Sequence, residues 1–326
     1  MTAALLEARG LRKHFTVGRG MFHRRGPVVR AVDGVSFEIM PGQTLGVVGE
    51  SGCGKTTTAK LVLYLEVPTE GSVQFDGRPL AALDGDGVRR YRRSVQAVFQ
   101  DPYASLNPRM RVGAIVAEPL VTHEALGRGT VDGRVTELLD YVGLPARAAT
   151  LFPHEFSGGQ RQRIAIARAL AVSPRLIVLD EPVSALDVSI RAQILNLLRD
   201  LQRQLGVSYL FIAHDLAAVA HMSHTIAVMY LGKIVEIGPA AAVARTPKHP
   251  YTQALFAAAL PSHPDEARDD MVLAGEVPSP LAPPSGCRFH PRCPSAMPHC
   301  ATDEPGLRRH ADRRVACHLY EGPPSA

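Results

Sequence analysis

Apolar residues follow two patterns in the segments expected to form strands. Val35, Phe37 and Ile39 alternate with polar neighbours, which is typical of a strand with one buried face. Residues 44–48 and 176–179 are short continuous apolar runs, which are typical of strands covered on both faces. The first kind indicates antiparallel strands, and the second indicates a central, mostly parallel sheet.

Helical periodicity dominates between these strands. Residues 58–65 contain few helix breakers, and residues 131–142 belong to a mainly helical stretch from 110 to 170. A long amphipathic helix ends at Gly206 and carries six apolar residues on one face: Ile190, Ile194, Leu197, Leu198, Leu201 and Leu205. The pattern predicts an α/β fold with a mostly parallel core, an antiparallel β subdomain, and a helical subdomain at roughly residues 101–170.

Composition and charge narrow the class of protein only slightly. The 326 residues suit one large domain and a smaller one, with 46% hydrophobic and 21% charged residues. The net charge is a modest +5, and we interpret the arginine-rich residues 89–93 as a solvated helix face, so no nucleic-acid partner is expected. No apolar run approaches the roughly 18 residues of a membrane span. Residues 3–6 are too short for a secretory signal, so we expect a cytosolic protein.

A phosphate-binding loop follows the strand expected at residues 44–48. It fits G-x-x-x-x-G-K-[ST] and comprises Gly49, Glu50, Ser51, Gly52, Cys53, Gly54, Lys55, Thr56 and Thr57. Its glycines let backbone N–H groups point into one concavity, and the helix N-terminus behind it adds partial positive charge. Lys55 is expected to reach the phosphates, and Thr56 to hold Mg²⁺ through its hydroxyl. The motif predicts a nucleoside triphosphate site rather than a plain glycine-rich turn.

Two acids follow the apolar run at residues 176–179. Asp180 and Glu181 would lie at the carboxyl edge of the parallel sheet, where open α/β sheets bind ligands. Asp180 is expected to reach Mg²⁺ directly or through water, and Glu181 to polarise an attacking water. The alternative is that both acids cap the next helix. His214 lies just past the strand expected at residues 208–212, and this position favours a role in the site over a structural one.

Ser157, Gly158, Gly159 and Gln160 open a further predicted helix. Ser157 is a natural N-cap, and the two glycines allow a ligand to approach the backbone closely. Many helices begin with Ser-Gly, so the motif alone is not specific. The position of its helix directly before the strand that ends in two acids is what indicates a functional role.

In this order, the stretches resemble the ATP-binding subunit of an ABC transporter. The resemblance covers most of residues 1–240 and includes Gln100, which opens a turn-rich loop, and Asp187, which follows the acidic strand. It implies a head-to-tail pair of such subunits that sandwiches two ATP molecules. Each ATP would lie between the phosphate loop of one subunit and the Ser157–Gln160 motif of the other.

The resemblance also implies roles for single residues. Phe15 matches the aromatic residue that stacks on adenine, although tyrosine is more usual there. Glu181 matches the catalytic base, while His214 contacts the γ-phosphate and orients the water. Gln100 links Mg²⁺ to the loop facing the membrane subunits, and Asp187 lies in the loop that crosses the dimer interface.

Beyond about residue 240 the composition changes and cysteines accumulate. Four of the five cysteines follow the spacing C-x5-C-x6-C-x16-C: Cys287, Cys293, Cys300 and Cys317. Disulfides are not expected in a reducing cytosol, and the spacing is not the C-x2-C of ordinary zinc sites. Four thiolates can hold an iron–sulfur cluster. Zinc with help from His290, His299 or His318, and free thiols, are the alternatives.

The tail resembles the C-terminal extension of dipeptide and oligopeptide importer ATPases, a group that includes nickel and some glutathione importers. The matching stretches are residues 249–252, 286–294 and 316–319. The resemblance implies an ABC ATPase domain at residues 1–245 and an extension at 246–326, whose four cysteines are candidate ligands of a [4Fe-4S] cluster.

We therefore expect an ATP-hydrolysing motor for peptide uptake at the cytoplasmic face of the membrane. It would form a heterodimer with a homologous ATPase, bind two permease subunits, and act indirectly with a substrate-binding protein. The alternatives are an ATPase of a nickel, glutathione or other small-solute importer, an exporter ATPase, a non-transport ABC ATPase, and a binding module without catalysis. The tail argues against an exporter, and the single cassette without sustained heptads argues against a non-transport ATPase.

Overall fold

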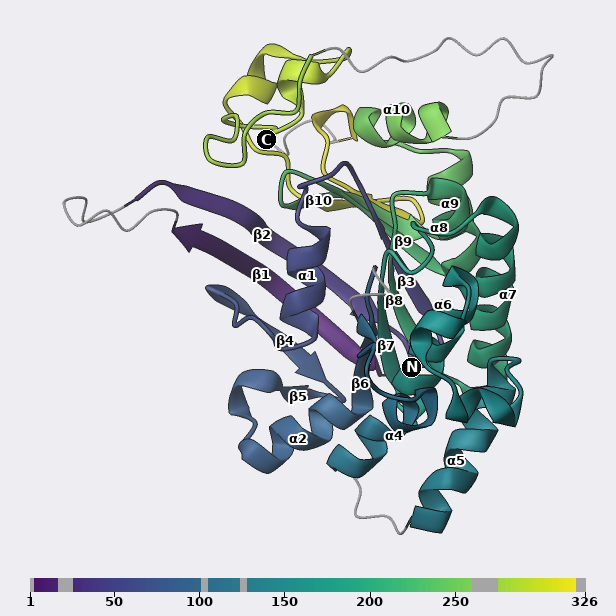
Figure 1. Ribbon diagram of the computed structural model, residues 1–326. Helices are drawn as coiled ribbons and strands as arrows, with labels where there is room; N and C mark the ends of the chain where they lie inside the picture. Colours follow the sequence, from purple (N-terminus) through teal and green to yellow (C-terminus); the bar gives the residue numbers. More distant parts are fainter. Residues whose placement is uncertain (1–2, 17–25, 101–104, 124–127, 260–274, 321–326) are drawn as a thin grey trace.

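The computed structural model describes residues 3–16, 26–100, 105–123, 128–259 and 275–320 (Figure 1). A four-stranded antiparallel sheet is built largely from the N-terminal part of the chain. Its strands are, in spatial order, β2 (Val28–Ile39), β1 (Leu6–Thr16), β4 (Glu70–Phe75) and β5 (Arg78–Pro79). In β2 the side chains of Val35, Phe37 and Ile39 are buried, as their alternation predicts.

An eight-stranded sheet forms the core. Its spatial order is β11 (Arg308–His310), β12 (Arg313–Val315), β10 (Lys233–Pro239), β9 (Thr225–Tyr230), β3 (Thr44–Val48), β8 (Ser208–Ile212), β7 (Leu176–Asp180) and β6 (Val95–Val98). From β9 to β6 the neighbouring strands run parallel, whereas β10, β12 and β11 pair antiparallel. The prediction of a mostly parallel α/β core beside an antiparallel subdomain is confirmed.

Helices and the antiparallel sheet cover the two faces of this core. The α-helices are α1 (Lys55–Val62), α2 (Gly85–Ser94), α4 (Val112–His123), α5 (Arg128–Tyr141), α6 (Gly158–Leu170), α7 (Val188–Leu205), α8 (Leu216–Met222), α9 (Ala240–Arg245) and α10 (Pro250–Ala259). Short 3₁₀ turns lie at Leu80–Ala82, Ala146–Thr150, Pro153–Glu155, His290–Arg292, Pro298–Ala301 and His318–Tyr320. In Figure 1, α1 lies on the side of the antiparallel sheet, and α6 and α7 lie on the other side of the core.

Alternate residues of the central strands pack into two different hydrophobic clusters. In β7, Leu176 and Val178 pack with β1, β2 and α1, whereas Ile177 and Leu179 pack with the helices α4 to α8. A strand that is covered on both faces needs apolar side chains at every position, which explains the continuous apolar run. The arrangement also places α1 and α6 on opposite faces of the core sheet.

One boundary differs from the sequence-based expectation. The helix expected at residues 58–65 spans Lys55–Val62, and the chain turns at Tyr64, whose φ is +54°. β6 ends at Val98, and the Phe99 side chain that follows it is 45% exposed. The apolar face of α7 is buried at Ile194, Leu198 and Leu201. Its last predicted residue, Leu205, is 40% exposed. The helix ends there, before the left-handed Gly206, as predicted.

The C-terminal tail joins the core sheet, which the sequence did not indicate. In the hairpin β11–β12, Val315 pairs with Glu236 of β10, and Arg314 pairs with Ile237. Among the described residues, no helix is both long enough and apolar enough to cross a membrane.

Candidate functional site

The central parallel strands end level with one another at one edge of the core. Ile212 of β8 pairs with Val47 of β3 on one side and with Asp180 of β7 on the other. Leu179 in turn pairs with Val98 of β6. The residues that follow these strands therefore meet at this edge, and they include the phosphate loop, both predicted acids and His214.

The phosphate loop is shaped by three glycines with positive φ. Gly49, Gly52 and Gly54 have φ values of +151°, +77° and +111°, in the region that favours glycine. A Cβ atom on Gly49 would lie 2.1 Å from the Met229 carbonyl oxygen, and one on Gly54 would lie 2.3 Å from that of Ala31. The loop therefore fits tightly between β9 and β2 and delivers the chain directly into α1.

Lys55 is buried within this loop. Its Nζ donates hydrogen bonds to the carbonyl oxygens of Gly49 (2.7 Å) and Glu50 (3.0 Å) and lies 3.9 Å from the sulfur of Cys53. Burial raises the pKa of the Cys53 thiol, which keeps it neutral beside the ammonium group. The structure thus holds a fixed positive charge inside the curl of the loop.

Thr56 and Asp180 lie together behind the loop. The Thr56 side chain lies near enough to the Asp180 carboxylate to favour its charged form. Burial and the neighbouring charge of Glu181 raise the pKa of Asp180, and Lys55 opposes that rise. A hydroxyl and a carboxylate are hard oxygen ligands, and a divalent cation would offset the repulsion between the two acids. These residues fit a Mg²⁺ site.

Glu181 and His214 face each other across the ends of β7 and β8. His214 Nδ1 lies 3.5 Å from Glu181 Oε2. Glu181 has a φ of +50°, which is rare for a residue other than glycine, and its N–H donates to the Ile212 carbonyl oxygen at 2.8 Å. The left-handed backbone leaves the Glu181 side chain 22% exposed and that of His214 60% exposed. Strained backbone of this kind is often found at catalytic positions.

The Ser157–Gln160 motif caps α6 as predicted. Ser157 Oγ accepts the Gln160 N–H at 3.4 Å, and Gln160 Oε1 accepts the Ser157 N–H at 3.0 Å, which completes a capping box. Both side chains are exposed. A Cβ atom on Gly159 would lie 2.4 Å from Ile190 Cγ2, whereas the nearest atom to one on Gly158 would be Leu186 Cδ2 at 3.4 Å. Gly159 therefore permits close packing of α6 against α7.

Phe15, Gln100 and Asp187 come from elements other than the phosphate loop. Phe15 is half-buried in β1, with Lys13 Nζ at 5.1 Å from the centre of its ring. Gln100 is exposed in the bend after β6, and the following residues 101–104 lie outside the described part of the chain. Asp187 is exposed at the start of α7, beside the 79% exposed Val188.

Comparison with known proteins agrees with this geometry. A family model described as ABC transporter matches residues 32–184, and one described as oligopeptide/dipeptide transporter, C-terminal region, matches residues 235–300. The di/tripeptide transport ATP-binding protein DppF of Pseudomonas aeruginosa is 49% identical over 97% of this chain and 98% of its own length. The oligopeptide transport ATP-binding protein OppF of Salmonella typhimurium is 50% identical over 96% of this chain and 95% of its own length. This chain belongs to the family of peptide-type ABC transporter ATP-binding proteins.

A solved structure supports the same assignment. The ATP-binding cassette MJ0796, in a dimeric post-hydrolysis state bound to ADP and Pi, aligns with a TM-score of 0.63 at 29% identity. The alignment covers 72% of this ABC ATPase and 98% of the solved chain.

The tail of this ABC ATPase brings its four cysteines together. The Cys287 N–H donates to the Cys300 carbonyl oxygen at 2.8 Å. Burial raises the pKa of Cys317 to about 11, and the charges of Cys287, Cys293 and Cys300 add to that rise. Ligand atoms of His299, Cys300 and His318 also lie within 4.8 Å of one another. The cysteine thiols and the two histidines are ligands that suit a soft metal centre.

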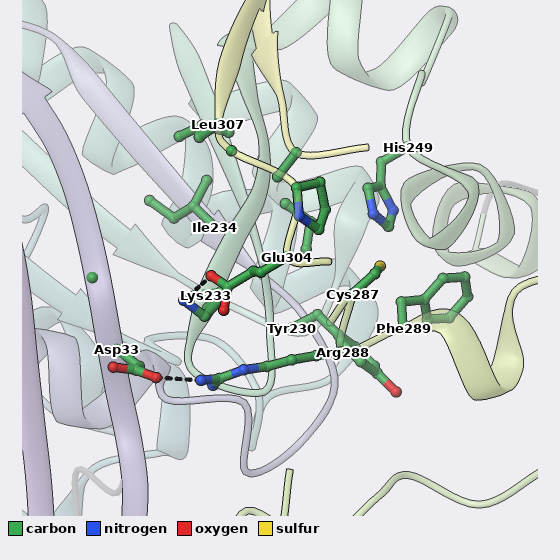
Figure 2. Close-up of a pocket in the computed structure, with 15 residues that line it drawn as sticks. Asp33, Tyr230, Lys233, Ile234, His249, Cys287, Arg288, Phe289, Glu304 and Leu307 are labelled. Atoms are coloured by element: carbon green, nitrogen blue, oxygen red, sulfur yellow. Dashed lines mark hydrogen bonds and ion pairs between the residues drawn. The ribbon is translucent and has the colours of Figure 1, made fainter. Parts of the chain in front are cut away.

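A cavity of about 130 Å³ separates the tail from the core sheet. Figure 2 shows Arg288 extending to Asp33 and Lys233 pairing with Glu304 at its rim. His249 also lines the cavity, and complete burial lowers its pKa to about 3, so it is neutral. Sequence reasoning missed these polar contacts, because nothing in the spacing of single arginines indicates a partner elsewhere in the chain.

Proposed function

We propose that this ABC ATPase is the ATP-hydrolysing subunit of an importer for dipeptides and oligopeptides at the cytoplasmic face of the cell membrane. The observation that carries the proposal is the gathering of Thr56, Asp180, Glu181 and His214 beside the phosphate loop at one sheet edge. The substrate class rests on the matched C-terminal region and on relatives named for di/tripeptide and oligopeptide transport.

ATP would bind along the phosphate loop. The backbone from Gly49 to Thr57 would surround the phosphates, with Lys55 Nζ as the fixed cation and the N-terminus of α1 behind it. Phe15 would stack on the adenine from β1.

Mg²⁺ would be held by the Thr56 hydroxyl, the Asp180 carboxylate and the Gln100 amide, and when bound it supplies positive charge at the phosphates. Glu181 accepts a proton from the attacking water, because its carboxylate is partly exposed at the strand edge. His214 orients that water and contacts the γ-phosphate.

A second ATPase subunit would complete each site. The phosphate loop leads into α1, whereas the Ser157–Gln160 motif opens α6, and these helices pack on opposite faces of the core sheet. The exposed capping box can therefore serve the ATP bound by a partner, and the exposed Asp187 and Val188 would lie in that interface. A homologous subunit of the same importer, giving a heterodimer, is the proposed partner.

Two permease subunits would dock beside the Gln100 bend. A groove of about 180 Å³ lies between β6, α4 and α6 and is lined by Phe99, Pro119, Ala165 and Arg168. The 45% exposed Phe99 directly precedes Gln100, so a permease helix in this groove would sense movement at the nucleotide site. The substrate-binding protein would act only through the permeases.

The four tail cysteines would hold a [4Fe-4S] cluster. All four thiols are buried or half-buried, and burial raises the pKa values of Cys287, Cys293 and Cys317. A cation centre would offset this cost by binding the cysteines as thiolates. Iron, sulfide and zinc analysis of anaerobically purified protein tests the assignment. Iron and sulfide in equal amounts that disappear in Cys293→Ser support the cluster, whereas zinc alone would assign the site to zinc with His299 and His318.

Reconstitution into vesicles tests the transport function. We expect the ATPase rate to rise when the permeases, the binding protein and a dipeptide are all present, and Glu181→Gln to abolish it. Stimulation by nickel or glutathione instead of peptides would change the proposed substrate, but the protein would still be an importer ATPase. Hydrolysis that ignores the permeases would favour a non-transport ABC ATPase.

A further inference from the structure

The tail contacts the phosphate loop through one carboxylate. Arg292 Nη1 donates to Glu50 Oε2 at 2.9 Å, and Nη2 donates to Glu50 Oε1 at 3.1 Å. The Arg292 side chain is 7% exposed and that of Glu50 is 25% exposed. Two parallel hydrogen bonds between planar charged groups fix both position and orientation. The second residue of the phosphate loop is therefore clamped by a residue 242 positions away in the sequence.

Tyr251 of α10 holds the backbone of the same residue. The Glu50 N–H donates to the Tyr251 hydroxyl oxygen at 2.9 Å. The Tyr251 ring is completely buried, with its centroid 4.7 Å from that of Tyr230 and 5.4 Å from that of Phe289. Since these rings fix the hydroxyl, the Glu50 N–H is directed into the tail rather than into the loop.

These contacts shape the charge that the loop presents. The Glu50 carbonyl oxygen accepts a hydrogen bond from Lys55 Nζ at 3.0 Å, so Glu50 joins the tail to the phosphate-binding lysine. An unpaired carboxylate in the loop would repel a triphosphate, and Arg292 supplies its counter-charge. The clamp neutralises the Glu50 carboxylate, so that the positive charge of Lys55 acts on the phosphates without an opposing charge in the loop.

The clamp is itself anchored on both sides of Phe289. Arg292 closes a 3₁₀ turn by donating its N–H to the Phe289 carbonyl oxygen at 3.0 Å. Arg288 donates to the Leu231 carbonyl oxygen and pairs with Asp33, as Figure 2 shows. The segment between Cys287 and Cys293 is therefore fixed to the core at two arginines.

We infer that Arg292 and Tyr251 are positioning residues for ATP, which act through Glu50 and make nucleotide affinity depend on the folded C-terminal extension. The inference rests on the nucleotide site proposed above. It extends the role of the tail from a substrate-class marker to a part that completes the phosphate loop.

Isothermal titration of the full chain with the analogue AMP-PNP and Mg²⁺ tests the inference. We expect Arg292→Met to raise the Kd about tenfold, because it leaves the Glu50 carboxylate unpaired beside the triphosphate. Tyr251→Phe removes a single oxygen atom and should raise the Kd about threefold. In steady state both variants should raise KM for ATP with kcat changed less than twofold. If Arg292→Met does not fold, Tyr251→Phe alone decides, and an unchanged Kd contradicts the inference.

A double-mutant cycle tests whether Arg292 affects nucleotide binding through Glu50. In the Glu50→Gln background, Arg292→Met should raise the Kd by no more than about twofold, because the charge that it neutralised is gone. Effects that multiply would show that Arg292 acts independently of Glu50 and would overturn the inference.

Arg313→Met is the matched control. Arg313 is a buried arginine of the same extension, but it pairs with Glu236 at 3.2 Å and not with Glu50. We expect it to lower Tm without changing the Kd, and an equal rise in Kd would mean that general loosening is the cause. Lys55→Ala tests the nucleotide site independently of Arg292 and Tyr251. If it does not weaken AMP-PNP binding, the phosphate loop is not the nucleotide site.

Discussion

His214 and Glu181 meet at the ends of neighbouring parallel strands, with 3.5 Å between Nδ1 and Oε2. The pair exists because β7 and β8 are in register at Asp180 and Ile212, so the residues that follow emerge at the same level. A carboxylate that can accept a proton thus lies beside an imidazole that can hold a water.

Glu181→Gln should lower ATP hydrolysis by about two to four orders of magnitude, because an amide cannot accept the proton of the attacking water. Binding of ATP should persist, since the phosphate loop and Lys55 are untouched. Phosphate release and nucleotide titration measure the two effects separately. Glu137→Gln, on the exposed surface of α5, is the control and should retain the wild-type rate. Full hydrolysis by Glu181→Gln would remove Glu181 from the catalytic role.

Asp180→Asn should stabilise the ligand-free protein while abolishing Mg²⁺-dependent hydrolysis. The Asp180 charge is buried and repelled by Glu181, and a neutral amide relieves both costs. Thermal unfolding should show a higher Tm without nucleotide and no added stabilisation by Mg²⁺ with ATP. Asp76→Asn is the opposite case, because Arg175 lowers the pKa of that exposed carboxyl, so its loss should not raise Tm. A lower Tm for Asp180→Asn would contradict the argument.

The sequence predicted the strands and the loop that bring these residues together, because their signals are local. The glycine spacing of the phosphate loop, the apolar run before Asp180 and the strand before His214 each determine a short segment. Parallel pairing then aligns the strand ends, and all of these residues meet without further information. The positive φ of Glu181 could not be predicted, because nothing in the local sequence favours a left-handed glutamate.

The tail was predicted less completely for a related reason. β11 and β12 have three residues each and are rich in arginine, so they carry no alternation that would indicate strands. The contact between Arg292 and Glu50 spans 242 positions and depends on how the whole tail folds over the core. Long-range polar contacts of this kind have no signature in a single sequence.

Asp33→Asn should weaken the attachment of the tail. It should also make thermal stability depend less on pH under acidic conditions. Burial alone would raise the pKa of Asp33, but Arg288, Lys233 and the hydrogen bond from His14 outweigh it, and Arg12 lies 3.4 Å away, so the pKa is lowered. A lowered pKa means that the stabilisation is present above about pH 5 and is lost as the pH falls through the folded-state value. We expect Asp33→Asn to cost about 1–3 kcal/mol at pH 7 and to show less change in Tm below pH 5 than the wild type. If Tm falls equally in the two proteins below pH 5, Asp33 does not contribute to the pH dependence of stability.

Gly159→Ala and Gly158→Ala should affect stability in opposite directions. At position 159 the new methyl group would lie 2.4 Å from Ile190 Cγ2, so α6 must move away from α7 at a cost of about 1–3 kcal/mol. At position 158 the nearest atom would be 3.4 Å away, which is an ordinary contact, and alanine in a helix gains up to about 1 kcal/mol over glycine. Denaturant unfolding of the two variants measures the difference directly. Equal stability of the two variants would mean that the α6–α7 contact relaxes freely and that Gly159 is not needed for packing.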